Sequence, residues 1–239
     1  MAKAKPFITE LSGKVGREIH YTRFGREYVR HVPTHYNDRK SEAQLRVREL
    51  FKTRQHVSAL LGIILQRGLT TEAHKAGMIE TCYFSRLNNN LFVYEDGKVY
   101  VDYPALLVAK GPLPEVEITG FQHEGLHIDA TFIPNLDHSK ASRDDVVHFY
   151  AVSPQADFCD LMASVMRVSG HASFDLPDLS DDPECTEQPV FYIYAITESN
   201  VTAGTPTLSA DEKQANKRHR NIDRKVSRSV FVGTVKIHR

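Results

Sequence analysis

Several residue types and patterns that mark large protein classes are missing from this sequence of 239 residues. It contains no tryptophan, and its three cysteines, Cys82, Cys159 and Cys185, lie too far apart for the CxxC spacing of a zinc or redox motif. The odd number argues against a disulfide framework, although one bridge stays open as an alternative. The longest apolar run, residues 59–65, is too short to cross a bilayer, which takes about 20 residues.

A secretory signal is also missing, because the lysines near the N-terminus are not followed by an apolar segment. Hydrophobic residues make up 41% of the chain, which is enough to build a core and argues against wholesale disorder. We therefore expect a soluble protein, without a transmembrane segment, that stays in the compartment where it is made.

The formal net charge is zero, but the charges are segregated along the chain. Residues 1–55 hold 13 Lys and Arg against 6 Asp and Glu, and residues 213–239 hold 9 against 1. The middle, residues 56–212, holds 8 against 23. A chain with basic ends and an acidic body is suited to binding polyanions through its ends. It is equally suited to self-association, in which the ends of one copy bind the body of another. As a further alternative, the ends meet the body within one molecule.

The clearest local signals lie near the N-terminus. Alternating residues over 14–21 and 27–32, around a Thr-Arg-Phe-Gly turn at 22–25, predict a two-stranded β-hairpin. Gly13 and Gly16 suggest a bulge or a close approach of another backbone. After a polar connector, Ser41 and Gln44 have the spacing of a capping box and predict the start of a helix.

The rest of the chain changes from helical to strand periodicity near residue 91. Helices are predicted over 41–54, with a break before His56, then over 57–66 and from Thr70 or Thr71 to about residue 87. Asp96-Gly97 predicts a hairpin with strands at 91–94 and 99–103, and a short strand is expected at 106–109. Seven further strands are predicted at 115–121, 126–133, 145–152, 160–168, 172–176, 190–197 and 229–237.

These elements predict an α+β fold, in which an N-terminal β-hairpin and a short helical layer precede an immunoglobulin-like antiparallel β-sandwich. Three parts are expected. Residues 1–40 form a basic β-hairpin arm and linker, and residues 41–111 form the helical layer with a short β-hairpin. Residues 112–239 form the sandwich, with an acidic loop at 177–188 and a basic loop at 198–228.

One motif points to chemistry, and we interpret it as fortuitous. Residues 123–127 read His-Glu-Gly-Leu-His, which matches the HExxH pattern of zinc proteases. That mechanism needs both histidines on one face of a helix, whereas the flanking sequence alternates like strands and places Gly125 at a turn. The acidic loop lacks the glycine and spacing of an EF-hand, and neither a GxSxG nor a GxxxxGK[ST] motif occurs. We therefore expect no catalytic residues, no metal and no cofactor.

Basic and aromatic residues make the candidate interaction site. The hairpin supplies the first group, which consists of Arg17, Arg23, Arg26, Arg30, Tyr21, Phe24 and Tyr28. The basic loop supplies the second, which consists of Lys213, Lys217, Arg218, Arg220 and Arg224. One interpretation is an arm that docks on protein, with its aromatic residues packed and its arginines beside carboxylates. The other is a ribbon that contacts a nucleic acid backbone and stacks on bases.

The run SGKVGxxxxYxxxGxxxVRxxPxxxxxxxxEAQxxxRxxF, at residues 12–51, resembles the opening of a family of uncharacterised Bacteroidota proteins that is known only as a domain of unknown function. The segment VDYPALLVAKGPL at 101–113 is similar too, whereas the long acidic and basic loops depart from that pattern. The resemblance implies no catalytic residues, and it favours a bacterial or phage-associated protein, cytoplasmic or virion-associated.

The function expected from the sequence is that of a non-enzymatic assembly or protein-interaction module. Its partner would be another protein or a second copy, bound through the basic ends and the acidic body, and no membrane is involved. The alternative is a nucleic-acid-binding protein that uses the hairpin and the basic residues 213–228.

Overall fold

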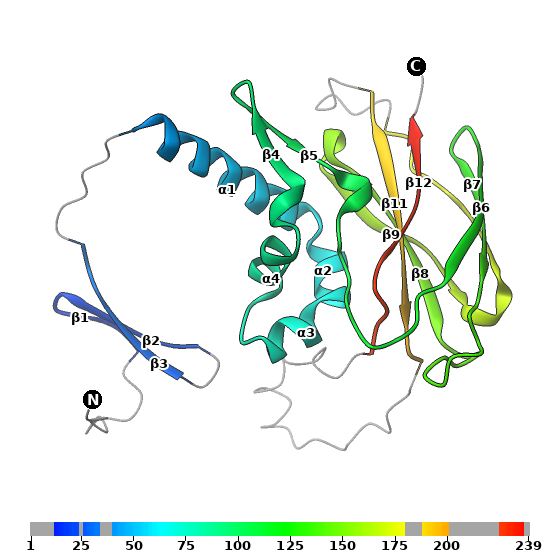
Figure 1. Ribbon diagram of the computed structural model, residues 1–239, viewed down its shortest axis with the longest axis horizontal. Helices are drawn as coiled ribbons and strands as arrows, with labels where there is room; N and C mark the ends of the chain where they lie inside the picture. Colours follow the sequence, from blue (N-terminus) through cyan, green and yellow to red (C-terminus); the bar gives the residue numbers. More distant parts are fainter. Residues whose placement is uncertain (1–11, 24–25, 34–39, 180–187, 201–224, 237–239) are drawn as a thin grey trace. The chain divides into compact units, whose positions relative to one another are not determined.

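The computed structural model describes residues 12–23, 26–33, 40–179, 188–200 and 225–236 (Figure 1). The chain divides into two compact units, Met1–Gln44 and Leu45–Arg239. The α+β class with a β-sandwich is confirmed. No helix in the described ranges is long and apolar enough to cross a membrane.

The first unit contains an antiparallel sheet of three strands instead of the expected two. Its strands are β1 (Gly13–Val15), β2 (Glu18–Arg23) and β3 (Arg26–His31), in the order β1-β2-β3. The extra strand arises because Gly16 has a φ of 60° at the first position of a two-residue loop, as a type II′ turn requires. No described atom lies within 4 Å of a Cβ built on Gly13 or Gly16, so the expected close backbone approach is wrong.

Four helices follow: α1 (Glu42–Leu60), α2 (Gly62–Gly68), α3 (Thr70–Lys75) and α4 (Glu80–Leu87). The capping box is confirmed, since the Ser41 amide donates to Gln44 Oε1 over 3.3 Å and the Gln44 amide donates to Ser41 Oγ over 3.4 Å. The predicted break before His56 is wrong. Helix α1 runs on to Leu60, because Val57 and Ser58 lie on its buried side and hold that turn against the core.

A short hairpin joins the helices to the sandwich. Strands β4 (Phe92–Glu95) and β5 (Lys98–Val101) pair across Asp96 and Gly97, whose φ values of 49° and 79° suit a type I′ turn. Two turns of 3₁₀-helix, η1 (Asn89–Leu91) and η2 (Tyr103–Ala105), flank the hairpin. The strand expected at 106–109 is wrong, since that segment is extended and its backbone is hydrogen-bonded mainly to side chains and loops.

All seven predicted sandwich strands are present. They are β6 (Glu117–Glu124), β7 (His127–Ile133), β8 (Val146–Ser153), β9 (Phe158–Met166), β10 (His171–Asp175), β11 (Val190–Glu198) and β12 (Val230–Lys236), with 3₁₀ turns η3 (Pro154–Ala156) and η4 (Arg167–Ser169). Two antiparallel sheets result, with the orders β10-β7-β6 and β12-β11-β8-β9. In the immunoglobulin constant arrangement the fourth strand joins the other sheet. The immunoglobulin-like detail therefore stays a prediction.

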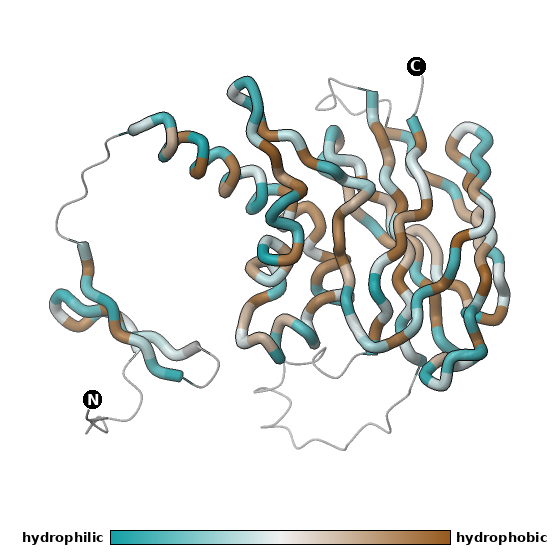
Figure 2. Tube along the Cα trace, in the orientation of Figure 1, coloured by the Kyte–Doolittle hydropathy of each residue, from teal (hydrophilic) through white to brown (hydrophobic). Residues whose placement is uncertain are grey.

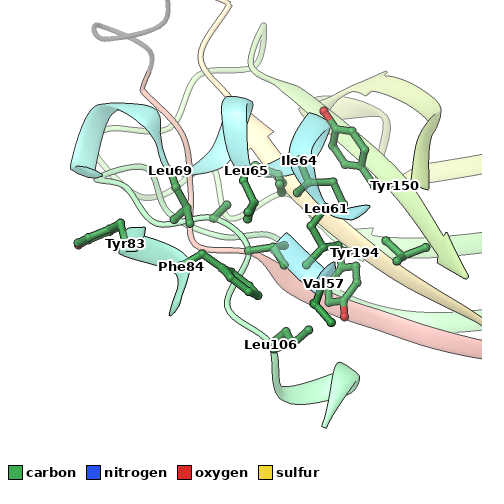
Figure 3. Packing of buried hydrophobic residues seen from close by; sticks show 14 of the residues in the cluster. Val57, Leu61, Ile64, Leu65, Leu69, Tyr83, Phe84, Leu106, Tyr150 and Tyr194 are labelled. Atoms are coloured by element: carbon green, nitrogen blue, oxygen red, sulfur yellow. The ribbon is translucent and has the colours of Figure 1, made fainter. Parts of the chain in front are cut away.

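The second unit has three layers, because the four-stranded sheet is covered on both faces. Tyr150, Val152, Tyr194 and Ile196 face the helices and form one core with them, including Leu61 (Figure 3). The alternate residues of β8 and β11 form a second core with the sheet β10-β7-β6. Along β6 and β7, by contrast, hydrophobic and hydrophilic residues alternate (Figure 2). The sheet β10-β7-β6 therefore keeps one polar face on the outside.

A buried ion pair fixes the loops at one end of the sandwich. Arg167 is fully buried, and its Nη1 donates to Asp145 Oδ2 over 3.2 Å. The same guanidinium donates to the carbonyl oxygens of Pro114 and Pro134. One side chain thereby connects the chain segments that enter β6, leave β7 and enter β8.

Candidate functional site

The sheet of the first unit has two chemically different faces. Residues opposite one another on neighbouring strands share a face, and successive residues alternate. The observed register pairs Lys14 with Ile19, Ile19 with Arg30, and Tyr21 with Tyr28. One face, here called the cationic face, therefore carries Lys14, Ile19, Tyr21, Arg26, Tyr28 and Arg30. The other carries Val15, Glu18, His20, Thr22, Glu27, Val29 and His31.

A pair of tyrosines forms the centre of the cationic face. The rings of Tyr21 and Tyr28 stack with their centroids 5.4 Å apart and an interplanar angle of 16°. They remain 41% and 40% exposed, so the pair presents aromatic surface to a partner. Within the described residues, Arg17, Arg26 and Arg30 have no carboxylate within ion-pair distance. On the cationic face, Arg26 and Arg30 therefore accompany the aromatic pair without a carboxylate partner among the described residues.

The opposite face carries Glu18 close to two histidines. Glu18 lies 3.5 Å from His20 Nε2 and 3.8 Å from His31 Nε2. The carboxylates of the sheet are therefore held away from the cationic face by the strand alternation.

The predicted interaction residues are only partly within the described chain. Arg17 lies exposed in the turn between β1 and β2, and the backbone register places Arg23 opposite Arg26. Phe24 and the residues Lys213, Lys217, Arg218, Arg220 and Arg224 lie outside the described residues. The structure therefore brings together Arg26, Arg30, Tyr21 and Tyr28 on one face, with Arg17 in the adjoining turn. The second basic group stays a prediction.

The HExxH pattern lies on a hairpin and not on a helix. His123 is in β6, His127 is in β7, and Gly125 in the turn between them has a φ of 59°. His123 is opposite Ile128, which faces the core, whereas His127 is opposite Glu124 on the outer face. The two histidines therefore point to different faces. Among the described residues, no group of three histidine, cysteine or acidic side chains is placed to hold a metal ion.

His127 instead belongs to a hydrogen-bonded cluster on the outer face. Its Nδ1 lies 2.6 Å from Asp175 Oδ1, and its Nε2 lies 3.0 Å from Ser173 Oγ. Asp129 lies between two histidines, with oxygens 3.6 Å from His127 Nε2 and 3.3 Å from His171 Nε2. The hydrogen bond to Asp175 is the largest effect on His127 and raises its pKa above the ordinary value. Desolvation opposes this rise, and the negative charges of Asp175, Asp129 and Glu124 add to it.

A Ser-His-Asp connectivity is one requirement of nucleophilic catalysis, which also needs donors for an oxyanion and a water-excluding cleft. The three residues here lie on an open sheet face. Cavities of about 680 and 540 Å³ lie elsewhere, around Glu115, Asn135 and Arg228. We derive no catalytic step from this cluster.

The sequence signal for the outer face is the alternation of polar residues within each strand. It does not reveal that β7 pairs with β10, which places His127 opposite Asp175 although they are 48 positions apart. The cluster was therefore missed from the sequence.

Comparisons with protein-family models, with curated proteins and with solved structures found no match to this chain. The resemblance of residues 12–51 to an uncharacterised family stays an expectation. Function is therefore inferred from the two sheet faces.

Proposed function

We propose that this protein is a non-enzymatic assembly module whose copies associate through the cationic face of the N-terminal sheet. The proposal is carried by two features of the described residues of the first unit: Arg26 and Arg30 have no carboxylate partner among them, and none of them forms a buried core. No residue of the first unit that the structure describes is buried. A small sheet is marginally stable without a packed face, so a partner surface would stabilise it.

Charge complementarity supports a second copy as that partner. Residues 56–212 carry a net charge of −15, so every copy offers acidic surface as well as a basic arm. Opposite charges steer association and fix orientation, even where individual exposed ion pairs contribute little. The stacked tyrosines add the aromatic anchor that is typical of protein interfaces.

The test is sedimentation velocity of the full chain over a range of concentrations at low ionic strength, where the Debye length exceeds about 10 Å. We expect larger species that dissociate as salt is added, and R26E/R30E should remain a monomer. The matched control K140E/R143E makes the same change of charge at exposed loop residues and should associate like the wild type. A wild-type chain that stays monomeric throughout would contradict the proposal.

A second candidate function, nucleic acid binding, is supported by the exposed Tyr21–Tyr28 pair, which shares its sheet face with the exposed Arg26 and Arg30. Base stacking on aromatic rings combined with cationic contacts to phosphate is the common mode of binding to single strands. Fluorescence anisotropy with labelled single-stranded RNA and DNA tests this. Binding that falls steeply with salt and is lost in Y21A/Y28A would favour it, and no binding at low salt would remove it.

A further inference from the structure

The outer face of the sheet β10-β7-β6 is the part of the body best matched to the cationic face. Its exposed side chains are those of Gln122, Glu124, His127, Asp129, Thr131, His171, Ser173 and Asp175, which together are here called the carboxylate face. Strands β6, β7 and β10 contain no Lys or Arg. Within these three strands, histidines are therefore the only side chains that can carry positive charge beside the carboxylates.

Hydrogen bonds and ion pairs order these carboxylates. Asp175 accepts from His127 over 2.6 Å, and Asp129 lies within 3.6 Å of both His127 and His171. Asp175 nevertheless remains 78% exposed. Carboxylates that are held in place but open to solvent lose less conformational entropy when a guanidinium group binds them.

The two faces are also similar in strand number and in the length of their strands. Both belong to antiparallel sheets of three strands, with β2 and β3 of six residues each and β7 of seven. At about 3.4 Å per residue these strands are each roughly 20 Å long, and neighbouring strands are about 4.8 Å apart. Apolar contact is available at one end, where Ile133 is 46% exposed on the outer face and Ile19 lies on the cationic face.

We propose that the carboxylate face of one copy receives the cationic face of a second copy. This inference rests on the proposed function and names the surface that the function needs. The contact is heterologous, because each copy contributes a different face, so copies join head to tail into a closed ring or an open filament. A nucleic acid is a poor occupant of this surface, because its phosphates and the carboxylates repel each other.

A charge-swap experiment with the full chain tests the pairing. The first variant is R26E/R30E in the cationic face, and the second is E124K/D175K in the carboxylate face. Each variant alone carries two faces of like charge and should bind at least about ten-fold more weakly than the wild type, since like charges across an interface disfavour it strongly. A mixture of the two restores opposite charges at each contact and should associate again. The control E49K/E95K makes the same change of charge at exposed residues outside the face and should associate normally.

Circular dichroism and thermal unfolding of each variant establish that it is folded. Weakening by both variants with recovery in the mixture supports the inference. If R26E/R30E prevents association but E124K/D175K does not, assembly through the arm stands and this receiving surface is wrong. Weakening by both without recovery in the mixture also overturns the pairing. If the wild type does not associate, the inference and the proposed function are both contradicted. Chemical crosslinks that join the arm only to the body of the same copy would have the same meaning.

Discussion

At the scale of single residues, the buried Arg167–Asp145 pair should be costly to break, because removing one partner leaves the other buried without its counter-charge. Burial lowers the pKa of the Arg167 guanidinium, and the hydrogen bond and charge of Asp145 act in the opposite direction. Asp145→Ala would leave a fully buried cation with only carbonyl oxygens as partners. We expect the free energy of unfolding to fall by about 3–5 kcal/mol.

Urea unfolding measures this loss. Circular dichroism is the appropriate signal, because the chain has no tryptophan whose fluorescence could be followed. The neighbouring exposed residue provides the control, since Asp144→Ala should change stability by less than about 0.5 kcal/mol. Equal effects of the two substitutions would show that the pair does not hold the loops.

His127 gives a second prediction at this scale. Its pKa is raised chiefly by the hydrogen bond to Asp175, so the folded state favours the protonated imidazole. The resulting stability is fully present below the ordinary histidine pKa of about 6.5 and is lost as pH rises through the higher value of the folded protein. In Asp175→Asn, NMR titration should find the His127 pKa lowered towards the ordinary value. An unchanged titration would mean that Asp175 is not the cause.

At the scale of elements, Asn88 holds a segment that the sequence predicts as a strand. Asn88 is buried, its Oδ1 accepts the Leu107 amide over 2.7 Å, and its Nδ2 donates to the Leu107 and Phe84 carbonyl oxygens over 3.0 Å each. Asn88→Ala leaves Leu107 without these partners and should lower the free energy of unfolding by about 1–3 kcal/mol. The exposed Asn90→Ala serves as the control in the same urea titration, and a loss as large as that in Asn88→Ala would refute the role.

Signals between neighbouring residues predicted most helices and strands. They gave wrong predictions where residues distant in the sequence determine the local structure. The capping box at Ser41 and the Asp96-Gly97 hairpin were predictable, because neighbouring residues alone determine them. The segment 106–109 has the apolar pattern of a strand, but Asn88 and Ser229 occupy its backbone in place of a strand. Similarly, Gly16 was recognised as special, yet only the pairing of Val15 with Glu18 shows that it makes a turn.

At the scale of the whole molecule, the long-range pairings set both the layers and the two candidate faces. The seven strands are visible in sequence, but the burial of β8 on both faces depends on the helices that pack on Tyr150 and Val152. The cationic face follows from the alternation of residues along β2 and β3 and was nearly predictable. The carboxylate face could not be predicted from the sequence, because it forms only when β10 pairs with β7.

The assembly should also depend on pH, because histidines are the only cations in the strands of the carboxylate face. His127 faces Asp175, Asp129, Glu124 and Ser173, and His171 faces Asp129. Protonation of His127 adds positive charge opposite the arginines of the incoming arm. Because the pKa of His127 is raised, its protonation begins at a higher pH than that of an ordinary histidine. Association should therefore weaken as pH falls through the raised pKa of His127, which lies above the ordinary value of about 6.5.

Sedimentation of the full chain at fixed low salt follows this change. In H127Q/H171Q the face keeps its carboxylates but cannot gain positive charge, so association should become nearly independent of pH. The matched control is H20Q/H31Q, which removes the two histidines on the opposite face of the arm and should keep the wild-type dependence. If the control loses the pH dependence and H127Q/H171Q retains it, the proton acts on the arm and not on the receiving sheet.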